Sequence, residues 1–191
     1  MGNREALLDG AKRCLIEKGY VKTTARDIAD AAGVSLAAIG YHFGSKESLL
    51  EQAFMNAMEE WFEDDAEYRH AEQEPGSLER FKQFFEEVIA SFPSQRPLMR
   101  LNIEMGLEGM HHPGLGAFMA QAVDYGRMEL AKELVGLDPE KDGDVARQVG
   151  SFCSLLMTGL VCQYLMAQEK FPTAADLAEG LRYIAERLRP A

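Results

Sequence analysis

The stretch from Thr24 to Leu50 constrains the fold more than any other part of the chain. Thr24 followed three residues later by Asp27 is a capping box, in which the two side chains pair with backbone N–H groups at a helix start. Gly33 is the residue type that ends a helix, and Ser35 is one that caps the start of the next. The spacing therefore predicts a short helix, a tight glycine turn and a second helix.

The second helix is expected over Leu36–Phe43. Gly44 ends it, and Ser45 can cap a third helix that begins at Lys46. Two short helices joined by a tight turn form a helix-turn-helix, whose second helix can enter the DNA major groove. Lys46 favours this interpretation, because the ammonium and the N–H groups at a helix start can share one phosphate.

The same segment carries a longer pattern of continuous spacing: Gly19-Tyr20, Thr23-Thr24, Ile28-Ala29, Ala32-Gly33-Val34-Ser35 and Gly40-Tyr41-His42-Phe43-Gly44-Ser45-Lys46-Glu47. This pattern resembles the N-terminal domain of the TetR family of bacterial transcription regulators. The resemblance covers about the first fifty residues. It implies an all-α fold, with a three-helix helix-turn-helix domain at residues 1–50 and a helical ligand-binding and dimerisation domain at residues 51–191.

The resemblance also implies which residues contact DNA. Phosphate roles go to Thr23, Tyr41, His42 and Lys46, base-proximal roles to Arg26, Ser35, Leu36, Ala37 and Ala38, and Thr24 and Gly40 complete the predicted DNA-binding set. Arg26 alone among these side chains can fork onto guanine O6 and N7. Leu36 and the two alanines offer only apolar contacts, which suit thymine methyl groups, so part of the readout is expected from DNA shape.

The net charge of −11 is unevenly divided along the chain. Residues 1–50 hold seven Lys/Arg and six Asp/Glu, whereas residues 51–191 hold thirteen and twenty-five. The acidic groups are therefore kept away from the predicted DNA surface. They either suppress non-specific DNA binding or serve only as a solvated surface.

Composition favours a cytoplasmic protein without a membrane span or signal peptide. No apolar run is expected to approach ~18 residues, and the N-terminus is charged from the start. The cysteine count points to the same compartment, because three cysteines, an odd number, fit a reducing environment. Cys153 and Cys162 are too far apart on one helix for an internal disulfide, so small buried hydrophobes are expected, with redox sensing across a dimer as the alternative. His111 and His112 lack partners at metal-ligand spacing, and we predict no metal and no cofactor.

Helical periodicity continues to the end of the chain. One long helix is expected from Lys46 to about Arg69, uninterrupted by proline or glycine. Further helices are expected from Ser77 to Pro93, as a short helix opened by Pro97, over residues 115–135, 144–168 and 174–188, with a turn at His111–Gly114 and a loop at Gly136–Gly143.

The last two predicted helices carry apolar stripes that indicate dimerisation. A helix that is apolar over most of its circumference must be covered on two sides, and a four-helix bundle with a second copy does this. The alternative is that the stripes are covered within one protomer. The predicted interface comprises Val149, Cys153, Leu160, Val161, Tyr164, Leu177, Leu181, Ile184 and Leu188.

The region after residue 50 is rich in bulky, adaptable side chains with a few polar groups between them, as ligand sites are. The predicted ligand-binding set is Trp61, Phe62, Phe81, Phe85, Met99, Ile103, Phe118, Tyr125, Phe152, Leu156 and Met157. Each of these residues alone would equally suit a hydrophobic core. The expected effector is a small apolar molecule.

Three classes of function compete. An enzyme is not expected, because the chain has no phosphate-binding glycine loop, nucleophile elbow or distinctive carboxylate pair. An all-helical dimeric small-molecule-binding protein without operator activity would leave Tyr41, His42 and Lys46 unexplained. The sequence therefore predicts a homodimeric regulator, a repressor by resemblance, that an apolar effector releases from an inverted-repeat operator.

Overall fold

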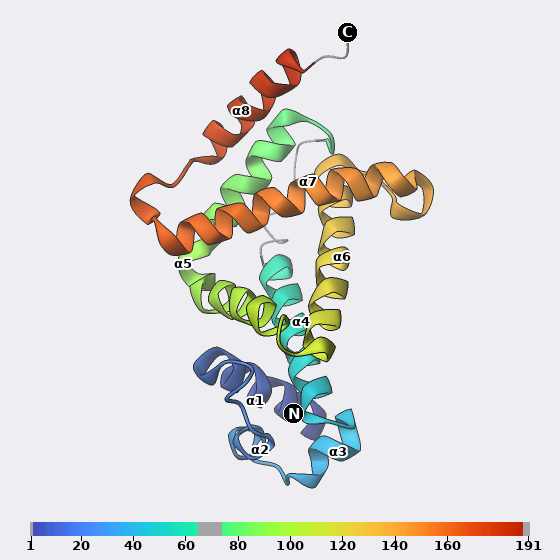
Figure 1. Ribbon diagram of the computed structural model, residues 1–191, viewed down its shortest axis with the longest axis vertical. Coiled ribbons are helices and arrows are strands. Elements are labelled where there is room, and N and C mark those ends of the chain that lie inside the picture. The colour runs from blue at the N-terminus through green and yellow to red at the C-terminus, as the bar shows by residue number, and fades with distance from the viewer. Residues whose placement is uncertain (1, 65–73, 189–191) are drawn as a thin grey trace. The chain divides into compact units, whose positions relative to one another are not determined.

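The structure is a computed structural model that describes residues 2–64 and 74–188; the side chains of residues 62–64 lie outside the described part. The described ranges contain helices and no strand. The elements in chain order are α1 (Asn3–Lys18), α2 (Ala25–Ala32), α3 (Ala37–Phe43), α4 (Lys46–Asp64), α5 (Leu78–Glu108), α6 (Pro113–Val135), α7 (Pro139–Met166), the 3₁₀ turn η1 (Gln168–Lys170) and α8 (Ala174–Arg187). The all-α class predicted from the sequence is confirmed (Figure 1).

The chain divides into two compact units, each described separately below. The first unit takes the residues up to Glu63 together with Pro97–Ala122, and the second takes Asp64–Arg96 and Val123–Ala191. Helices α5 and α6 thus contribute one part to each unit. A domain boundary at residue 50 stays a prediction.

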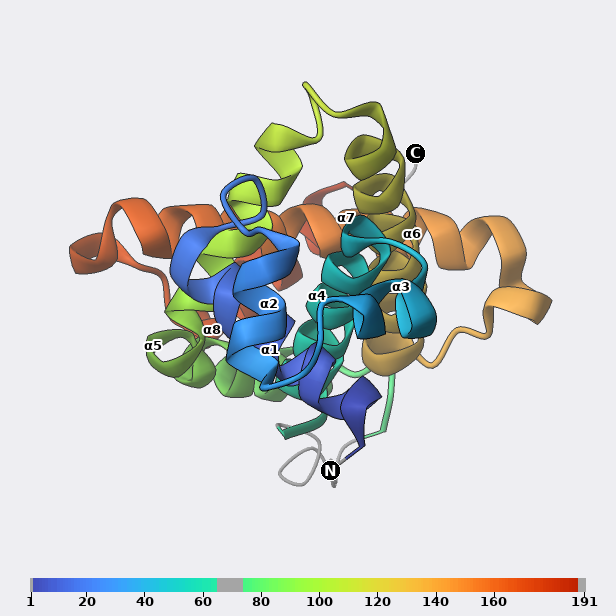
Figure 2. The same ribbon diagram turned by 90° about the horizontal axis from the view of Figure 1, so that it is seen from below.

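Helices α1, α2 and α3 gather beside the start of α4 in the first unit (Figure 2). The α2 start has the predicted capping box, in which Asp27 N–H donates to Thr24 Oγ1 over 3.1 Å and Thr24 N–H donates to the Asp27 carboxylate over 2.9 Å. Gly33 ends α2 in the left-handed conformation, with φ 65° and ψ 30°. The small core between these helices is apolar and fully buried, and includes Leu7, Leu15, Ile28, Ile39 and Leu49.

The second unit is built on the first half of α5, the second half of α6, α7 and α8. Its core includes the fully buried rings of Phe84, Phe85 and Phe92. The buried guanidinium of Arg80 pairs with the Glu133 carboxylate and its Nε donates to the Glu133 carbonyl over 3.4 Å, which ties α5 to α6. Burying this charge is tolerated because it is paired and hydrogen-bonded.

Two helix boundaries predicted within α5 were wrong. Helix α5 does not end at Pro93, and Pro97 does not open a new helix: one helix continues through both prolines. The residues around them keep an apolar face, since Phe92, Leu98 and Met99 are all buried, and this packing outweighs the cost of the missing N–H groups. The hydroxyls of Ser91 and Ser94 each donate to a backbone carbonyl three residues back, over 2.8 Å.

The predicted loop at Gly136–Gly143 is also shorter than expected. Helix α7 begins at Pro139, where the Asp138 side chain accepts from the Glu140 N–H over 3.0 Å. Gly143 is the non-helical point within α7, with φ 40° and ψ −106°. Helix α3 begins at Ala37, one residue later than expected, and the carbonyl of Ser35 rather than its hydroxyl accepts there. The end of the long helix predicted to reach Arg69 lies outside the described residues.

Helix α7 is long and apolar enough, by length and composition, to cross a membrane. Its best window has a mean hydropathy of 1.5, and the expectation that no apolar run reaches this length was wrong, because residues 149–166 contain no charged side chain. A core helix of a helical bundle has the same composition, so this finding is weak support for a membrane span.

Candidate nucleic-acid interface and an apolar groove

The exposed side of α3 and the starts of α2 and α4 carry the predicted DNA-binding residues. Tyr41 is 86% exposed and Leu36 is 51% exposed, although both are bulky. Arg26 is exposed on α2 with its guanidinium available, and His42 and Lys46 are half-buried. The remaining members of the set at this surface are Ser35, Ala37, Ala38 and Gly40, of which only Ala38 is half-buried.

Three consecutive rings and a cation lie at the end of α3. Tyr41 and His42 meet edge to face with ring centroids 4.8 Å apart, and the Arg4 guanidinium lies 5.3 Å from the Phe43 ring centre. Arg4 also donates to the Gln52 side chain over 2.6 Å, so α1 holds the turn between α3 and α4. These contacts leave the Tyr41 hydroxyl free to reach outward.

The two adjacent threonines have different environments. Thr24 is exposed and its hydroxyl belongs to the capping box of α2. Thr23 is 1% exposed, and its hydroxyl bonds to the carbonyls of Gly19 and Cys14 over 2.7 and 3.2 Å. The implied phosphate contact from the Thr23 side chain is therefore corrected: this hydroxyl is enclosed and already used.

The ammonium of Lys46, at the start of α4, lies close to a backbone carbonyl and to a carboxylate. Its Nζ donates to the Thr23 carbonyl over 3.2 Å and lies 3.5 Å from Glu47 Oε1. The Lys46 side chain is 25% exposed, so part of it lies at the surface. Glu47 competes for that ammonium, and its position next to Lys46 in the sequence is the signal that predicts this.

The predicted ligand-binding residues fall into both units. Trp61, Met99, Ile103 and Phe118 belong to the first unit, and Phe81, Phe85, Tyr125, Phe152, Leu156 and Met157 belong to the second. Phe85 and Met99 are fully buried, whereas Tyr125 and Phe152 are about half exposed. The side chain of Phe62 lies outside the described residues.

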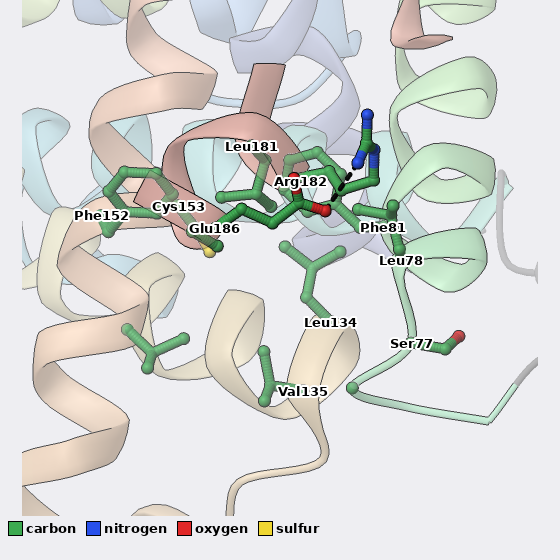
Figure 3. A pocket seen from close by; sticks show the side chains of 13 residues that line it. Ser77, Leu78, Phe81, Leu134, Val135, Phe152, Cys153, Leu181, Arg182 and Glu186 are labelled. Atoms are coloured by element: carbon green, nitrogen blue, oxygen red, sulfur yellow. Dashed lines mark hydrogen bonds and ion pairs between the residues drawn. The ribbon is translucent and has the colours of Figure 1, made fainter. Parts of the chain in front are cut away.

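An apolar groove of about 550 Å³ lies in the second unit, where the start of α5 and the end of α6 meet α7 and α8 (Figure 3). Buried Phe81, Leu134 and Cys153 are among the residues that line it. Arg182 and Glu186 lie along one side and pair with each other over 2.6 Å. Among the described side chains of the predicted ligand-binding set, only Phe81 and Phe152 line this groove. Burial raises the pKa of the Cys153 thiol, so this sulfur is a neutral apolar contact.

The predicted dimer stripe on α7 is corrected by burial. Cys153, Leu160 and Val161 are buried inside the second unit, and the Tyr164 ring packs on Phe92 and Phe171 at centroid distances of 5.1 and 5.5 Å. Cys153, Leu160 and Val161 therefore do not present a surface to a second copy, whereas Tyr164 is half-buried and stays a prediction. Val149, Leu177 and Leu181 are half-buried, and only Ile184 and Leu188 are exposed as the prediction requires.

The opposite side of α7 is the exposed apolar one. Seven apolar side chains on α7 and α8 are more than half exposed, and we call them the exposed α7–α8 face: Val145, Phe152, Leu155, Met166, Tyr183, Ile184 and Leu188. Val145, Phe152 and Leu155 were missed or assigned to the ligand, although their spacing of seven and three residues indicates one helix face. Buried and exposed stripes on an apolar helix cannot be told apart from periodicity alone.

A sequence model described as bacterial regulatory proteins of the tetR family matches residues 7–53. The repressor KstR2 of Rhodococcus jostii is 41% identical over 61 residues, which are 32% of this chain and 30% of that protein. The match therefore spans less than a third of that repressor's length. The regulator BetI of Paraburkholderia xenovorans is 26% identical over 187 residues, covering 95% of this chain and 91% of that protein.

Similarity of fold extends over the whole chain. The multidrug binding protein EbrR, solved with imidazole, superposes with a TM-score of 0.65 and 21% identity, covering 100% of this chain and 97% of EbrR. At this identity the similarity shows the fold alone.

Proposed function

We propose that this chain, whose residues 7–53 match the tetR family model, is a cytoplasmic homodimeric repressor of that family of DNA-binding bacterial regulators. The observation that carries the proposal is the exposed side of α3. Tyr41 of α3 and Leu36, the residue just before α3, lie between two glycines of positive φ and are exposed to solvent, where an isolated fold gains nothing from them. A duplex would use both residues, the phenol on a phosphate and the leucine on a thymine methyl group.

A second copy is proposed to cover the exposed α7–α8 face. Seven bulky apolar side chains on two helices form more exposed apolar surface than scattered surface residues do. The apolar groove continues this face, because Phe152 belongs to both. A two-fold dimer places two α3 helices on one duplex, so the operator is proposed to be an inverted repeat with half-site centres about 34–36 Å apart.

The effector is proposed to be a small apolar molecule whose binding releases DNA. The support is the group of predicted ligand-binding residues buried in the second unit, such as Phe85 and Met157, and the ligand-bound state of the similarly folded EbrR. Because these side chains are packed, an effector must move them apart to enter. Such a movement can couple effector binding to DNA binding. The coupling is reciprocal: the effector lowers DNA affinity by the same factor by which DNA lowers effector affinity.

The test is operator affinity measured with and without a ligand that calorimetry has shown to bind. The DNA is the region upstream of the protein's own gene, labelled for fluorescence anisotropy. We expect specific binding that saturating ligand weakens 5- to 150-fold, the ordinary range of allosteric coupling. Ligand binding without any specific DNA binding would instead support an all-helical small-molecule-binding protein without operator activity.

A further inference from the structure

Thr23 is an interior residue at the edge of the proposed DNA surface. Thr23 is 1% exposed, and its hydroxyl donates to the Gly19 carbonyl over 2.7 Å, with the Cys14 carbonyl oxygen 3.2 Å away as a weaker second acceptor at the end of α1. The hydroxyl therefore fixes the peptide at residue 23 against α1. Thr24 beside it has no such contact, because its hydroxyl caps α2.

The peptide fixed in this way holds Lys46. The carbonyl of Thr23 accepts from Lys46 Nζ over 3.2 Å, although the two residues are 23 positions apart. Lys46 is the first residue of α4, where the helix dipole disfavours a cation. A carbonyl acceptor offsets part of that cost and restricts the long, flexible side chain to one region.

An ammonium has three donor hydrogens. One of them points to the Thr23 carbonyl, and Glu47 Oε1 lies 3.5 Å from the same nitrogen, beyond a good hydrogen bond. The Lys46 ammonium thus keeps donor hydrogens that can bind a phosphate oxygen. A side chain restricted before binding loses less freedom when it pairs with a phosphate.

We infer that Thr23 is a positioning residue for DNA binding: it does not touch DNA, and its hydroxyl and carbonyl hold Lys46 where a phosphate is contacted. This inference rests on the proposed function. It separates the roles of the two adjacent threonines, with Thr24 starting α2 and Thr23 linking α1 to the ammonium of Lys46.

The experiment is a double-mutant cycle on operator affinity, using Thr23→Val, Lys46→Ala and the double variant, with Thr23→Ser as rescue. Valine keeps the β-branched shape and removes the hydroxyl. We expect Thr23→Val to lower affinity about 5-fold in wild type and less than 2-fold in the Lys46→Ala background. The slope of log K against log salt should fall in both single variants, by roughly one unit per lost phosphate contact.

Thr24→Val is the matched control, because it changes the same residue type one position away. We expect its effect to add to that of Lys46→Ala, because the Thr24 hydroxyl bonds to Asp27. Additive effects of Thr23→Val and Lys46→Ala, or a salt slope that Thr23→Val leaves unchanged in a folded protein, would overturn the inference. Wild-type protein that fails to bind any upstream DNA would instead contradict the proposed function.

A measurement on the unmodified protein keeps the inference testable if Thr23→Val does not fold. Side-chain NMR relaxation at the Cε of each lysine reports how restricted its head group is without DNA. We expect Lys46 to be more ordered than the exposed Lys22, and equally ordered in Thr23→Ser. Lys46 as mobile as Lys22 would overturn the inference.

Discussion

Lys18 Nζ lies 2.5 Å from one oxygen of the Asp27 carboxylate, and this ion pair joins the last turn of α1 to the first turn of α2. The other oxygen of Asp27 accepts from the N–H and the hydroxyl of Thr24, over 2.9 and 2.6 Å. One carboxylate thus starts α2 and ties it to α1. Because all three contacts favour the ionised form, with Lys18 contributing most, the pKa of Asp27 lies well below its usual value.

This network predicts acid sensitivity of the folded protein. A carboxyl group with a depressed pKa contributes stability that is fully present above the unfolded pKa, near 4, and is lost as pH falls toward the folded pKa. Asp27→Asn should therefore lower the unfolding temperature at pH 7. The difference in unfolding temperature between the variant and the wild type should become smaller as the pH falls below 4. Thermal melts of both proteins from pH 7 to pH 2.5 measure this difference, and a constant gap between them over that range would contradict the prediction.

The exposed α7–α8 face predicts opposite outcomes for two glutamate substitutions on one helix. Leu155 is 71% exposed and Leu160 is 2% exposed. Leu155→Glu should give a folded monomer, because its carboxylate is solvated once the second copy is gone. Leu160→Glu should destabilise the fold itself by about 4 kcal/mol or more, since it buries an unpaired charge. Analytical ultracentrifugation with circular dichroism separates the two; a dimeric Leu155→Glu protein would place the interface elsewhere.

The crossing of α6 and α7 predicts a strict need for glycine at position 150. A Cβ atom there would lie 2.1 Å from the carbonyl oxygen of Arg127, which is backbone and can move only if a helix shifts. Gly150→Ala should cost about 1–3 kcal/mol of unfolding free energy. Gly126→Ala is the control, because its Cβ would meet nothing within 4 Å and alanine favours helix. Equal urea midpoints for the two variants would show that the crossing is looser than described.

Arg26 and His42 are predicted to affect different properties of DNA binding, Arg26 the choice of sequence and His42 the overall affinity. Arg26→Ala should flatten the preference among operator sequences, since an arginine fork on guanine is worth about 1–3 kcal/mol of discrimination. His42→Ala should weaken binding to all sequences alike, because phosphate contacts position the protein without specifying bases. Competition assays against a set of single-base operator variants measure both; a uniform loss in Arg26→Ala would remove its base-edge role.

Local chemistry made the first fifty residues predictable. The capping box of Thr24, the left-handed turn at Gly33 and the cap at Ser45 were all confirmed, because each depends on neighbours within four residues. Tertiary packing decided the rest. Pro93 and Pro97 lie inside α5, and Leu160 faces inward while Leu155 faces solvent, choices that depend on distant partners.

The candidate site shows the same division. The exposed position of Arg26 and Tyr41 follows from the helix-turn-helix pattern. The burial of Thr23 does not, because it depends on where the end of α1 lies. The ligand-binding set could be predicted only as a type of side chain, since aromatic and methionine residues at helical spacing serve cores and pockets equally.

The central claim is that two copies of this chain bind one inverted repeat through their α3 helices. The most direct measurement is stoichiometric titration of labelled upstream DNA, at concentrations well above Kd, with mass determined in the ultracentrifuge and protection mapped by footprinting. The account predicts an even number of protomers on each operator, two protected half-sites about one helical turn apart, and loss of both on Tyr41→Ala with Lys46→Ala. A single protomer on one unrepeated site, or protection unchanged by those substitutions, would contradict it.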